Sequence, residues 1–432
     1  MIQELRKLRK FNWPLFISLC ALSLLPAIYQ TIKTFIISTS NDNNVFNILG
    51  QMEWYDLINE TLIAFLIIPL YSILNKIKEY DENNFSQNVF KTGLITFISY
   101  SIFSLIVIAC GKSLIWGMNE NDIDLSVTYN YLILETIAFI VGVIITFINV
   151  VFVIIGKAKN FYILLGVKTF LSIIFDFILI PHLGVYGVAI SNIIVNTILG
   201  IVSSLILVKE KAISLCLFKK DDLTLFKTWL KIGVFSGMQQ FIDNLIYAVM
   251  ICKMVNMVAE QGNYWVANNF IWGYLLIPIQ AMAEIIKRDS KVGYANLEKS
   301  NYYLLTTLII LLEACTIPLW LSFYKNMEKL ENAKEIFVIT VKLAPFYIAY
   351  GFSIIIDSIF IGLGKTKYNM INSLIVNFIY YGIFYILYKT SVITFTMNVI
   401  ILMFGFGMVF HLIVSIVEEL IFKKYNKNSY NL

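Results

Sequence analysis

Apolar stretches of about twenty residues recur along almost the whole length of this 432-residue chain. An α-helix of that length spans the hydrocarbon core of a bilayer. Polar loops separate twelve such stretches, at about residues 13–37, 54–75, 92–116, 128–153, 161–180, 187–208, 228–252, 264–286, 301–323, 336–361, 369–388 and 392–417. The sequence therefore predicts an all-α integral membrane protein with twelve transmembrane helices.

The composition narrows the class of protein further. Hydrophobic residues make up 59% of the chain and charged residues only 14%, which does not suit the surface of a soluble domain. The run at 13–37 is too long for a signal peptide, so we expect it to remain as the first span. The five cysteines are far apart, so no disulfide framework, metal site or cofactor is expected. No basic block lies among exposed aromatics, so no nucleic-acid partner is expected.

The two halves of the chain carry a weak repeat. The segment IGKAK at 155–159 recurs as LGKTK at 363–367, and the dipeptide Ile68-Pro69 recurs as Ile277-Pro278. A third match, at a similar shift, aligns Gln30, Ile32, Lys33, Phe35 and Ile36 with Gln240, Ile242, Asp243, Leu245 and Ile246. An internal repeat in a hydrophobic chain is typical of secondary transporters. It predicts an N-lobe at 1–208, a linker at 209–227 and a C-lobe at 228–432, each lobe with six helices and related by a parallel repeat.

The Lys and Arg residues predict the orientation of the chain. Most of them lie at the N-terminus, in the even-numbered loops and in the C-terminal tail, and few lie in the odd-numbered loops. Cytoplasmic loops carry this excess in membrane proteins. We therefore expect a multi-pass protein of the inner membrane with both termini in the cytoplasm.

Four charged residues within spans are candidates for function, because an ionised group in the bilayer is costly and usually faces a cavity or a partner. Asp243 in span seven is the first candidate for binding a coupling cation or proton, and Glu313 and Asp357 follow. Lys33 is the repeat mate of Asp243, which predicts opposite charges facing each other or a snorkelling Lys33. Glu60 and Glu135 are expected to be hydrated near the outer interface.

Other polar and aromatic side chains could line a pocket for a large amphipathic molecule. Gln30 lies in span one. Span seven carries Gln239, Gln240, Asn244 and Tyr247, and the start of span eight carries Asn268, Asn269 and Trp272. His182 and His411 form no recognisable constellation with carboxylates, so the sequence does not predict an enzyme.

Three segments resemble multidrug and toxic compound extrusion (MATE) transporters. They are FDFILI at 175–180 with GVYGVAI at 184–190, read as a tight turn between spans five and six, GVFSGMQQ at 233–240, and LGKTK at 363–367. The resemblance covers nearly the whole chain. Flippases of polysaccharides and lipid-linked oligosaccharides, in the same superfamily, share several of these motifs, and the LIP at 179–181 is similar to theirs.

The resemblance implies a substrate path in a central cleft between the lobes and export driven by a proton or sodium gradient. In the NorM-like branch a helix-seven carboxylate binds the cation, and Asp243 matches it. The second carboxylate of that branch would fall near Phe352 or Ser353, so Asp357 is a shifted substitute. In the DinF-like branch an Asp of helix one performs the coupling, and Lys33 stands near that place here.

Together these features predict a cation-coupled secondary exporter of amphipathic small molecules that works by alternating access, as a monomer in membrane lipid. The transported ion is H+ or Na+. The alternative is a flippase for a lipid-linked oligosaccharide or a similar lipid-like substrate. A long basic cavity would favour this alternative, and Lys33, Lys168 and Lys342 within the spans are compatible with one. A membrane enzyme or receptor would need a catalytic cluster or a soluble domain, and the sequence contains neither.

Overall fold

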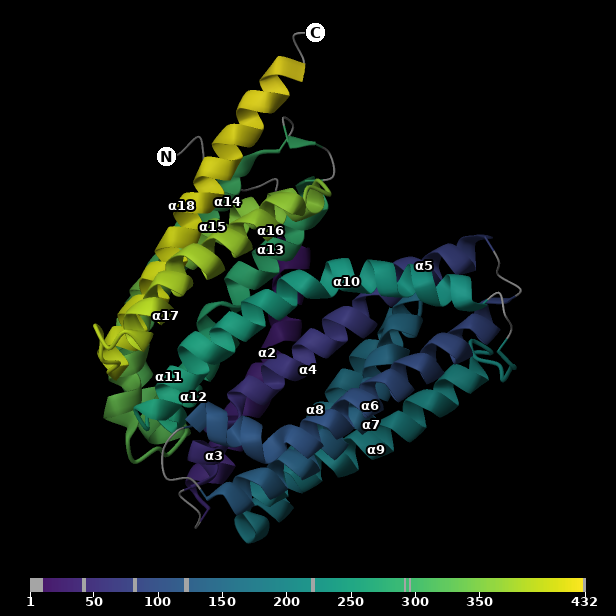
Figure 1. Ribbon diagram of the computed structural model, residues 1–432, viewed down its shortest axis with the longest axis horizontal. Coiled ribbons are helices and arrows are strands. Elements are labelled where there is room, and N and C mark those ends of the chain that lie inside the picture. Colours follow the sequence, from purple (N-terminus) through teal and green to yellow (C-terminus); the bar gives the residue numbers. More distant parts are fainter. Residues whose placement is uncertain are drawn as a thin grey trace. The chain divides into compact units, whose positions relative to one another are not determined.

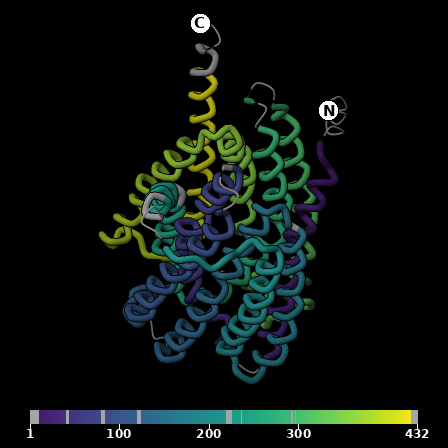
Figure 2. Tube along the Cα trace, turned by 90° about the vertical axis from the view of Figure 1, so that its right-hand side faces the viewer, coloured from purple at the N-terminus to yellow at the C-terminus, as the bar shows by residue number. Residues whose placement is uncertain are grey.

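The computed structural model describes residues 11–40, 44–80, 84–119, 124–218, 222–290, 293–294 and 297–429, and its regular elements in this part of the chain are all helical (Figures 1 and 2). The elements are α2 (Trp13–Ser38), α3 (Val45–Gln51), α4 (Glu53–Leu66), α5 (Ile68–Tyr80), α6 (Phe85–Asn119), α7 (Leu125–Ile154), α8 (Ala158–Leu183), α9 (Val185–Lys209), α10 (Asp222–Tyr247), η3 (Ala248–Cys252), α11 (Lys253–Met257), α12 (Gln261–Phe270), η4 (Ile271–Leu275), α13 (Ile277–Asp289), α14 (Lys299–Ser322), η7 (Phe323–Met327), α15 (Ala333–Gly362), α16 (Lys367–Leu374), η8 (Ile375–Tyr381), α17 (Gly382–Lys389) and α18 (Met397–Ser429). The elements named η are single stretches of π-helix.

Ten described helices are long and apolar enough to cross a membrane, and α12, η4 and α13 add an eleventh span if the pair, bent by 51°, is counted as one. The remaining expected span is the continuous helix formed by α10, η3 and α11. Its polar residues Gln239, Gln240, Asp243 and Asn244 lower its hydropathy. The all-helical membrane fold predicted from the sequence is confirmed. The chain ends at 1–10 and 430–432 lie outside the described residues, so the orientation of the termini stays a prediction.

The contacts of the chain define two compact units. Unit 1 takes residues 1–38 and 258–432, and unit 2 takes residues 39–257. Within unit 1, α2 packs on α13 and η4, and within unit 2, α10 packs on α4 and α5 (Figure 1). The packing therefore groups the first span with spans eight to twelve, and span seven with spans two to six. The division at 209–227 describes the repeat and stays a prediction; Lys219 and Lys220 of that linker lie outside the described residues.

The repeated glycine-lysine segment forms the same turn in both halves. Gly156 and Gly364 have positive φ angles of 77° and 70°. The amide of Lys157 donates to the carbonyl of Phe152 at 2.8 Å, and the amide of Lys365 donates to the carbonyl of Phe360 at 2.8 Å. A left-handed glycine followed by this bond ends a helix in the Schellman manner. The matching geometry supports the repeat at this place.

The Ile-Pro dipeptide also has the same role in both halves. It begins α5 at Ile68 and α13 at Ile277, and each of these helices has 13 residues. Proline is favoured in the first turn of a helix, where its missing N–H has no partner in the helix anyway. Spans two and eight are therefore both interrupted at the same position of the repeat.

The interruption of span two creates a backbone acceptor that α10 covers. Pro69 cannot donate to the carbonyl of Phe65, four residues earlier. Gly233 of α10 lies on this carbonyl so closely that a Cβ atom there would be 2.5 Å from the oxygen. The indole Nε1 of Trp229 donates to the next carbonyl, that of Leu66, at 3.0 Å. Small residues allow this approach between membrane helices, because they let two backbones meet.

A corresponding contact lies in unit 1. Ala27 of α2, which the repeat aligns with Gly237 of α10, packs against Gly273 of η4; a Cβ atom on that glycine would be 3.5 Å from the Ala27 side chain. The Tyr274 hydroxyl donates to the carbonyl of Ala27 at 3.2 Å, and it lies 2.7 Å from the hydroxyl of Thr31. Thus α2 meets span eight in unit 1 in the way that α10 meets span two in unit 2.

The turn expected at 181–187 is much shorter than the sequence indicated. Pro181 lies inside α8, and the chain reverses at Gly184 alone, which has a φ angle of 55°. At Gly187 a Cβ atom would come within 2.6 Å of the carbonyl oxygen of Leu179. The second glycine of the motif is therefore needed for the close start of α9 against the end of α8.

We expect Gly233→Ala to weaken the packing of α10 on α4, because the added methyl group would meet a backbone oxygen that cannot move alone. Overpacking of this kind costs about 1–3 kcal/mol. The matched control is Gly382→Ala, since Gly382 is also helical and its Cβ position is open. Thermal unfolding of the purified proteins in detergent should show a lower midpoint for Gly233→Ala only. Equal midpoints for both variants would contradict this account of the contact.

Candidate functional site

The polar side chains of α10 are largely used in packing against α4. The Asn244 amide donates to the carbonyl of Leu57 at 2.9 Å and to the hydroxyl of Thr61 at 3.1 Å, and its oxygen accepts from Gln240 at 2.9 Å. One turn along, the Tyr247 hydroxyl is 3.5 Å from a carboxylate oxygen of Glu53. These bonds give Asn244 and Tyr247 a structural role within unit 2.

Asp243 and Gln239, also on α10, are half-buried. Gln30 and Lys33 are half-buried on α2, and the amide nitrogen of Gln30 is buried without a hydrogen-bond partner among the described residues. Asp243 belongs to unit 2 and Lys33 to unit 1. The pairing of these two charges therefore stays a prediction.

Glu135 is not hydrated, in contrast to the expectation from the sequence. Its side chain on α7 is buried, and the amide of Asn192 on α9 donates to both of its carboxylate oxygens, at 3.0 and 3.2 Å. Glu60 on α4, by contrast, is exposed, and one of its carboxylate oxygens lies 3.5 Å from the Asn244 amide nitrogen. Because α7 and α9 pack tightly, a carboxylate near a span end is enclosed by its neighbours here.

Unit 1 brings several predicted residues together around Tyr347 of α15. The ring of Trp272, on η4, lies 6.2 Å from that of Tyr347 and 5.5 Å from that of Tyr350. The Tyr347 hydroxyl is 3.5 Å from the amide oxygen of Asn268. Trp272 is 38% exposed, so the cluster presents an open aromatic face. Asn269 is half-buried beside it in sequence, and its amide nitrogen has no partner among the described residues.

Glu313 on α14 lines a small cavity that Tyr347 also lines. The cavity has a volume of about 170 Å³ and lies between α13, α14 and α15; apart from Glu313 and Tyr347 it is lined mainly by apolar groups such as Ile279, Ala314 and Pro345. One carboxylate oxygen of Glu313 is buried without a hydrogen-bond partner in the described part of the chain. A buried carboxylate oxygen without a hydrogen bond is costly in such surroundings, and a bound proton or cation would compensate this cost.

Asp357 on α15 has a partner that the sequence did not indicate. The Nε2 atom of His411, on α18, lies 2.9 Å from Oδ2 of Asp357, and Ser415 donates to Oδ1 at 3.1 Å. The sequence showed no His/carboxylate constellation because these residues are 54 positions apart. Only the packing of α15 on α18 brings them together.

Glu328 is a second residue that sequence reasoning missed. It follows η7 directly, is 5% exposed, and hydrogen-bonds to Thr31 of α2. Burial raises the pKa of Glu328 to about 8, and the bond to Thr31 opposes this only in part. A carboxyl group in a polar loop is ordinarily hydrated, so the sequence contained no signal for this one.

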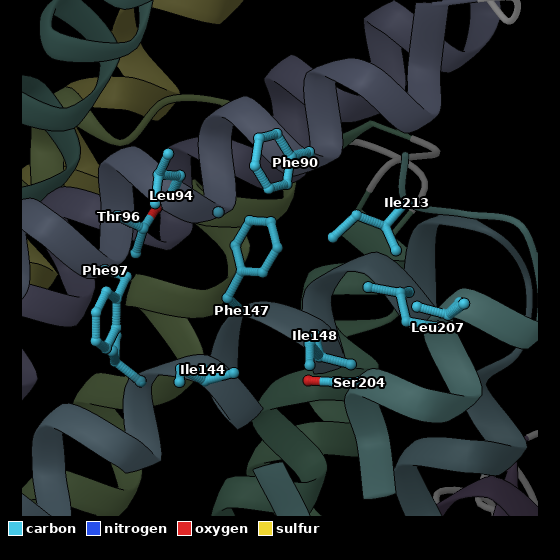
Figure 3. A pocket seen from close by; sticks show the side chains of 13 residues that line it. Phe90, Leu94, Thr96, Phe97, Ile144, Phe147, Ile148, Ser204, Leu207 and Ile213 are labelled. Carbon is cyan, nitrogen blue, oxygen red and sulfur yellow. The ribbon is translucent and has the colours of Figure 1, made fainter. Parts of the chain in front are cut away.

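Unit 2 contains a cavity of a different kind (Figure 3). It has a volume of about 240 Å³ between α6, α7 and α9, and the rings of Phe90, Phe97 and Phe147 line it. The polar side chains that line it are Thr96 and Ser204, and the Thr96 hydroxyl donates to the carbonyl of Thr92. No predicted site residue lines this cavity. Its mainly apolar lining would accommodate a hydrocarbon group.

Replacement of Glu328 should change how stability depends on pH. Its folded-state pKa of about 8 lies above its ordinary value of 4.5, so the folded protein holds a proton that the unfolded chain releases. The contribution of Glu328 to the free energy of unfolding is complete below pH 4.5, and it falls by roughly 1.4 kcal/mol per pH unit until about pH 8. Glu328→Gln should remove this decline. As pH rises from 5 to 9, the thermal midpoint of wild type should therefore fall relative to that of the variant. The exposed Glu331→Gln serves as the control; parallel curves for Glu328→Gln and wild type would refute the prediction.

No protein-family model matches the sequence, and no curated protein matches it either. Solved structures match along almost the whole chain. An inward-facing multidrug resistance MATE family transporter of the MOP superfamily has a TM-score of 0.70 at 16% identity, covering 93% of this chain and 95% of that one. A MATE protein in complex with Br-NRF has a TM-score of 0.60 at 14% identity, covering 94% and 93%.

A MOP superfamily transporter from Pyrococcus furiosus, for which the reverse polarity of the binding pocket suggests a different function, has a TM-score of 0.66 at 15% identity, covering 93% of both chains. Sequence identities at this level establish the fold and leave the substrate open. The chain therefore has the fold of the MATE transporters of the MOP superfamily, as the resemblance of its motifs predicted.

Proposed function

We propose that this protein is a cation-coupled secondary exporter of amphipathic small molecules that works by alternating access. The observation that carries the proposal is the presence of carboxyl groups inside the spanning helices of a transporter fold, at Asp243, Glu313 and Asp357. Membrane helices retain such groups where they bind ions or protons, since an unused charge there is costly.

Asp243 is the proposed coupling residue. It lies on α10 next to Asn244, whose bonds to α4 hold this turn of the helix in place. A cation or proton that binds to Asp243 in one conformation and leaves in another would couple its gradient to the movement of substrate. Glu313 and Asp357 are proposed as further ion-binding groups in unit 1.

The aromatic cluster of Trp272, Tyr347 and Tyr350 is the proposed contact for the substrate in unit 1. Aromatic faces attract organic cations, and Tyr347 of this cluster also lines the cavity that contains the carboxyl group of Glu313. The further substrate contacts proposed from the sequence are Gln30, Lys33, Gln239, Gln240, Asn244, Tyr247, Asn268 and Asn269. Among these, Asn244 and Tyr247 are the weakest candidates because they already bind α4.

A flippase for a lipid-linked, anionic substrate is the second candidate. Lys33 is half-buried in α2 and would bind a phosphate or carboxylate group. The similar Pyrococcus protein, with its reversed pocket polarity, supports keeping this alternative. The two candidates differ in the charge of the substrate, which makes them separable by experiment.

Transport in proteoliposomes with an imposed pH or sodium gradient tests the proposal. We expect gradient-driven movement of a fluorescent cationic dye by wild type, at least tenfold slower movement by Asp243→Asn, and unchanged movement by the control Glu331→Gln. Lys33→Ala, which removes one proposed substrate contact, should slow dye transport less than Asp243→Asn. Failure of both gradients to move any cationic dye would overturn the drug-export proposal. Movement of a fluorescent lipid-linked sugar that is lost in Lys33→Ala would then favour the flippase.

A further inference from the structure

A half-buried polar network joins α15, α16 and α18 at the end of unit 1 where α15 finishes. The His411 and Asp357 side chains face each other at 2.9 Å and are 32% and 19% exposed. The hydroxyl of Ser415 donates to the second oxygen of Asp357. From α16, Asn369 donates to the backbone carbonyl of Asp357 at 3.2 Å, and the buried Asn372 donates to Ser415 at 2.7 Å. The network therefore fixes both the carboxylate and the ring.

A second carboxyl group lies two helical turns farther along α18. Glu418 is 6% exposed, and both of its carboxylate oxygens are buried without a hydrogen bond from the described residues. It interacts electrostatically with Asp357 and His411. Asn372 is close to it, but the amide of Asn372 already donates to Ser415 and to the carbonyl of His411. The region around Asp357, His411 and Glu418 thus has more hydrogen-bond acceptors than donors.

Several other charged groups of the neighbouring helices have partners of their own. Glu419 on α18 binds Tyr294, Lys299 and Lys423. On α13, Glu284 pairs with Lys287, and Arg288 pairs with Asp289. Lys367 of α16 lies over the ring of Tyr368. Tyr350, two turns before Asp357 on the same face of α15, interacts electrostatically with it and is also part of the aromatic cluster.

We infer that Asp357 and His411 form a proton-binding site, with Glu418 as the next proton acceptor along α18. With a neutral histidine, two carboxylates share one enclosed region, which is unfavourable. One proton taken from water converts the imidazole to an imidazolium that faces the Asp357 carboxylate. A metal ion fits less well, because no three His, Cys, Asp or Glu side chains in the described ranges are grouped to hold one.

The site has a role in transport only if the proposed export function holds, in which case the proton is a coupling ion. Tyr350 then connects the site to Trp272, since it is near Asp357 and its ring lies 5.5 Å from that of Trp272. A charge change at Asp357 and His411 would reach the proposed substrate contact through one side chain. Proton binding itself does not depend on transport.

Histidine NMR tests the proton site directly, because the chain contains only His182 and His411. The protein, labelled with 13C at histidine Cε1 and held in lipid nanodiscs without gradient or substrate, gives two resonances, which His182→Asn assigns. We expect the His411 resonance to titrate, and its midpoint to move to lower pH by about 1–3 units in Asp357→Asn. Glu418→Gln should move it in the same direction by less, and the exposed Glu284→Gln should leave it in place.

A His411 resonance that does not shift between pH 4 and 9 would overturn the inference, as would one midpoint shared by wild type, Asp357→Asn and Glu418→Gln. If Asp357→Asn does not fold, the comparison of Glu418→Gln with Glu284→Gln decides. Dye transport by His411→Gln is measured separately. If His411 titrates but the protein transports nothing, the export proposal is refuted and the proton site stands. If the protein transports but His411 does not titrate, the proton site is refuted and the export proposal stands.

Discussion

The carbonyl group of Phe65 is a backbone acceptor that its own helix cannot satisfy, because Pro69 has no N–H to offer. Hydrocarbon supplies no water for such a group, so another helix must approach it. Gly233 of α10 makes this approach possible, and Trp229 satisfies the neighbouring carbonyl of Leu66. The place of α10 beside span two, and with it the composition of unit 2, depends on this contact.

The repeat imposes the same problem on the other half of the chain. Pro278 leaves the carbonyl of Tyr274 without its helical donor, and α2 packs at this point through Ala27. The bonds among Tyr274, Thr31 and Ala27 hold the two helices together. Each half therefore packs its first long helix against the interrupted helix of the other half, which explains why the units defined by contacts differ from the halves defined by sequence.

The two units differ in chemistry although their turns and interruptions match. In unit 2 the cavity between α6, α7 and α9 is apolar, and the buried Glu135 accepts hydrogen bonds from Asn192. In unit 1 the cavity contains Glu313, and Asp357 lies against a histidine. Unit 1, which carries the aromatic cluster, thus also carries two of the proposed ion-binding groups, Glu313 and Asp357. A repeat conserves backbone geometry, because helix ends and prolines are local features, while its side chains are free to diverge.

The sequence by itself determined the membrane class and the number and order of the spans, and its repeated Ile-Pro and glycine-lysine segments marked the places where the structure has matching helix starts and turns. These features depend on the cost of placing polar groups in hydrocarbon and on local backbone chemistry, both of which act on neighbouring residues. It also identified Asp243, Glu313, Asp357 and Trp272 as unusual, since polar groups stand out within an apolar helix. Only the tertiary structure decided what surrounds them: His411 beside Asp357, Tyr347 against Trp272 and in the lining of the cavity of Glu313, and the burial of Glu135 and Glu328. Those neighbours come from helices far apart in the chain, and which helices meet is decided by close packing, which no local pattern records.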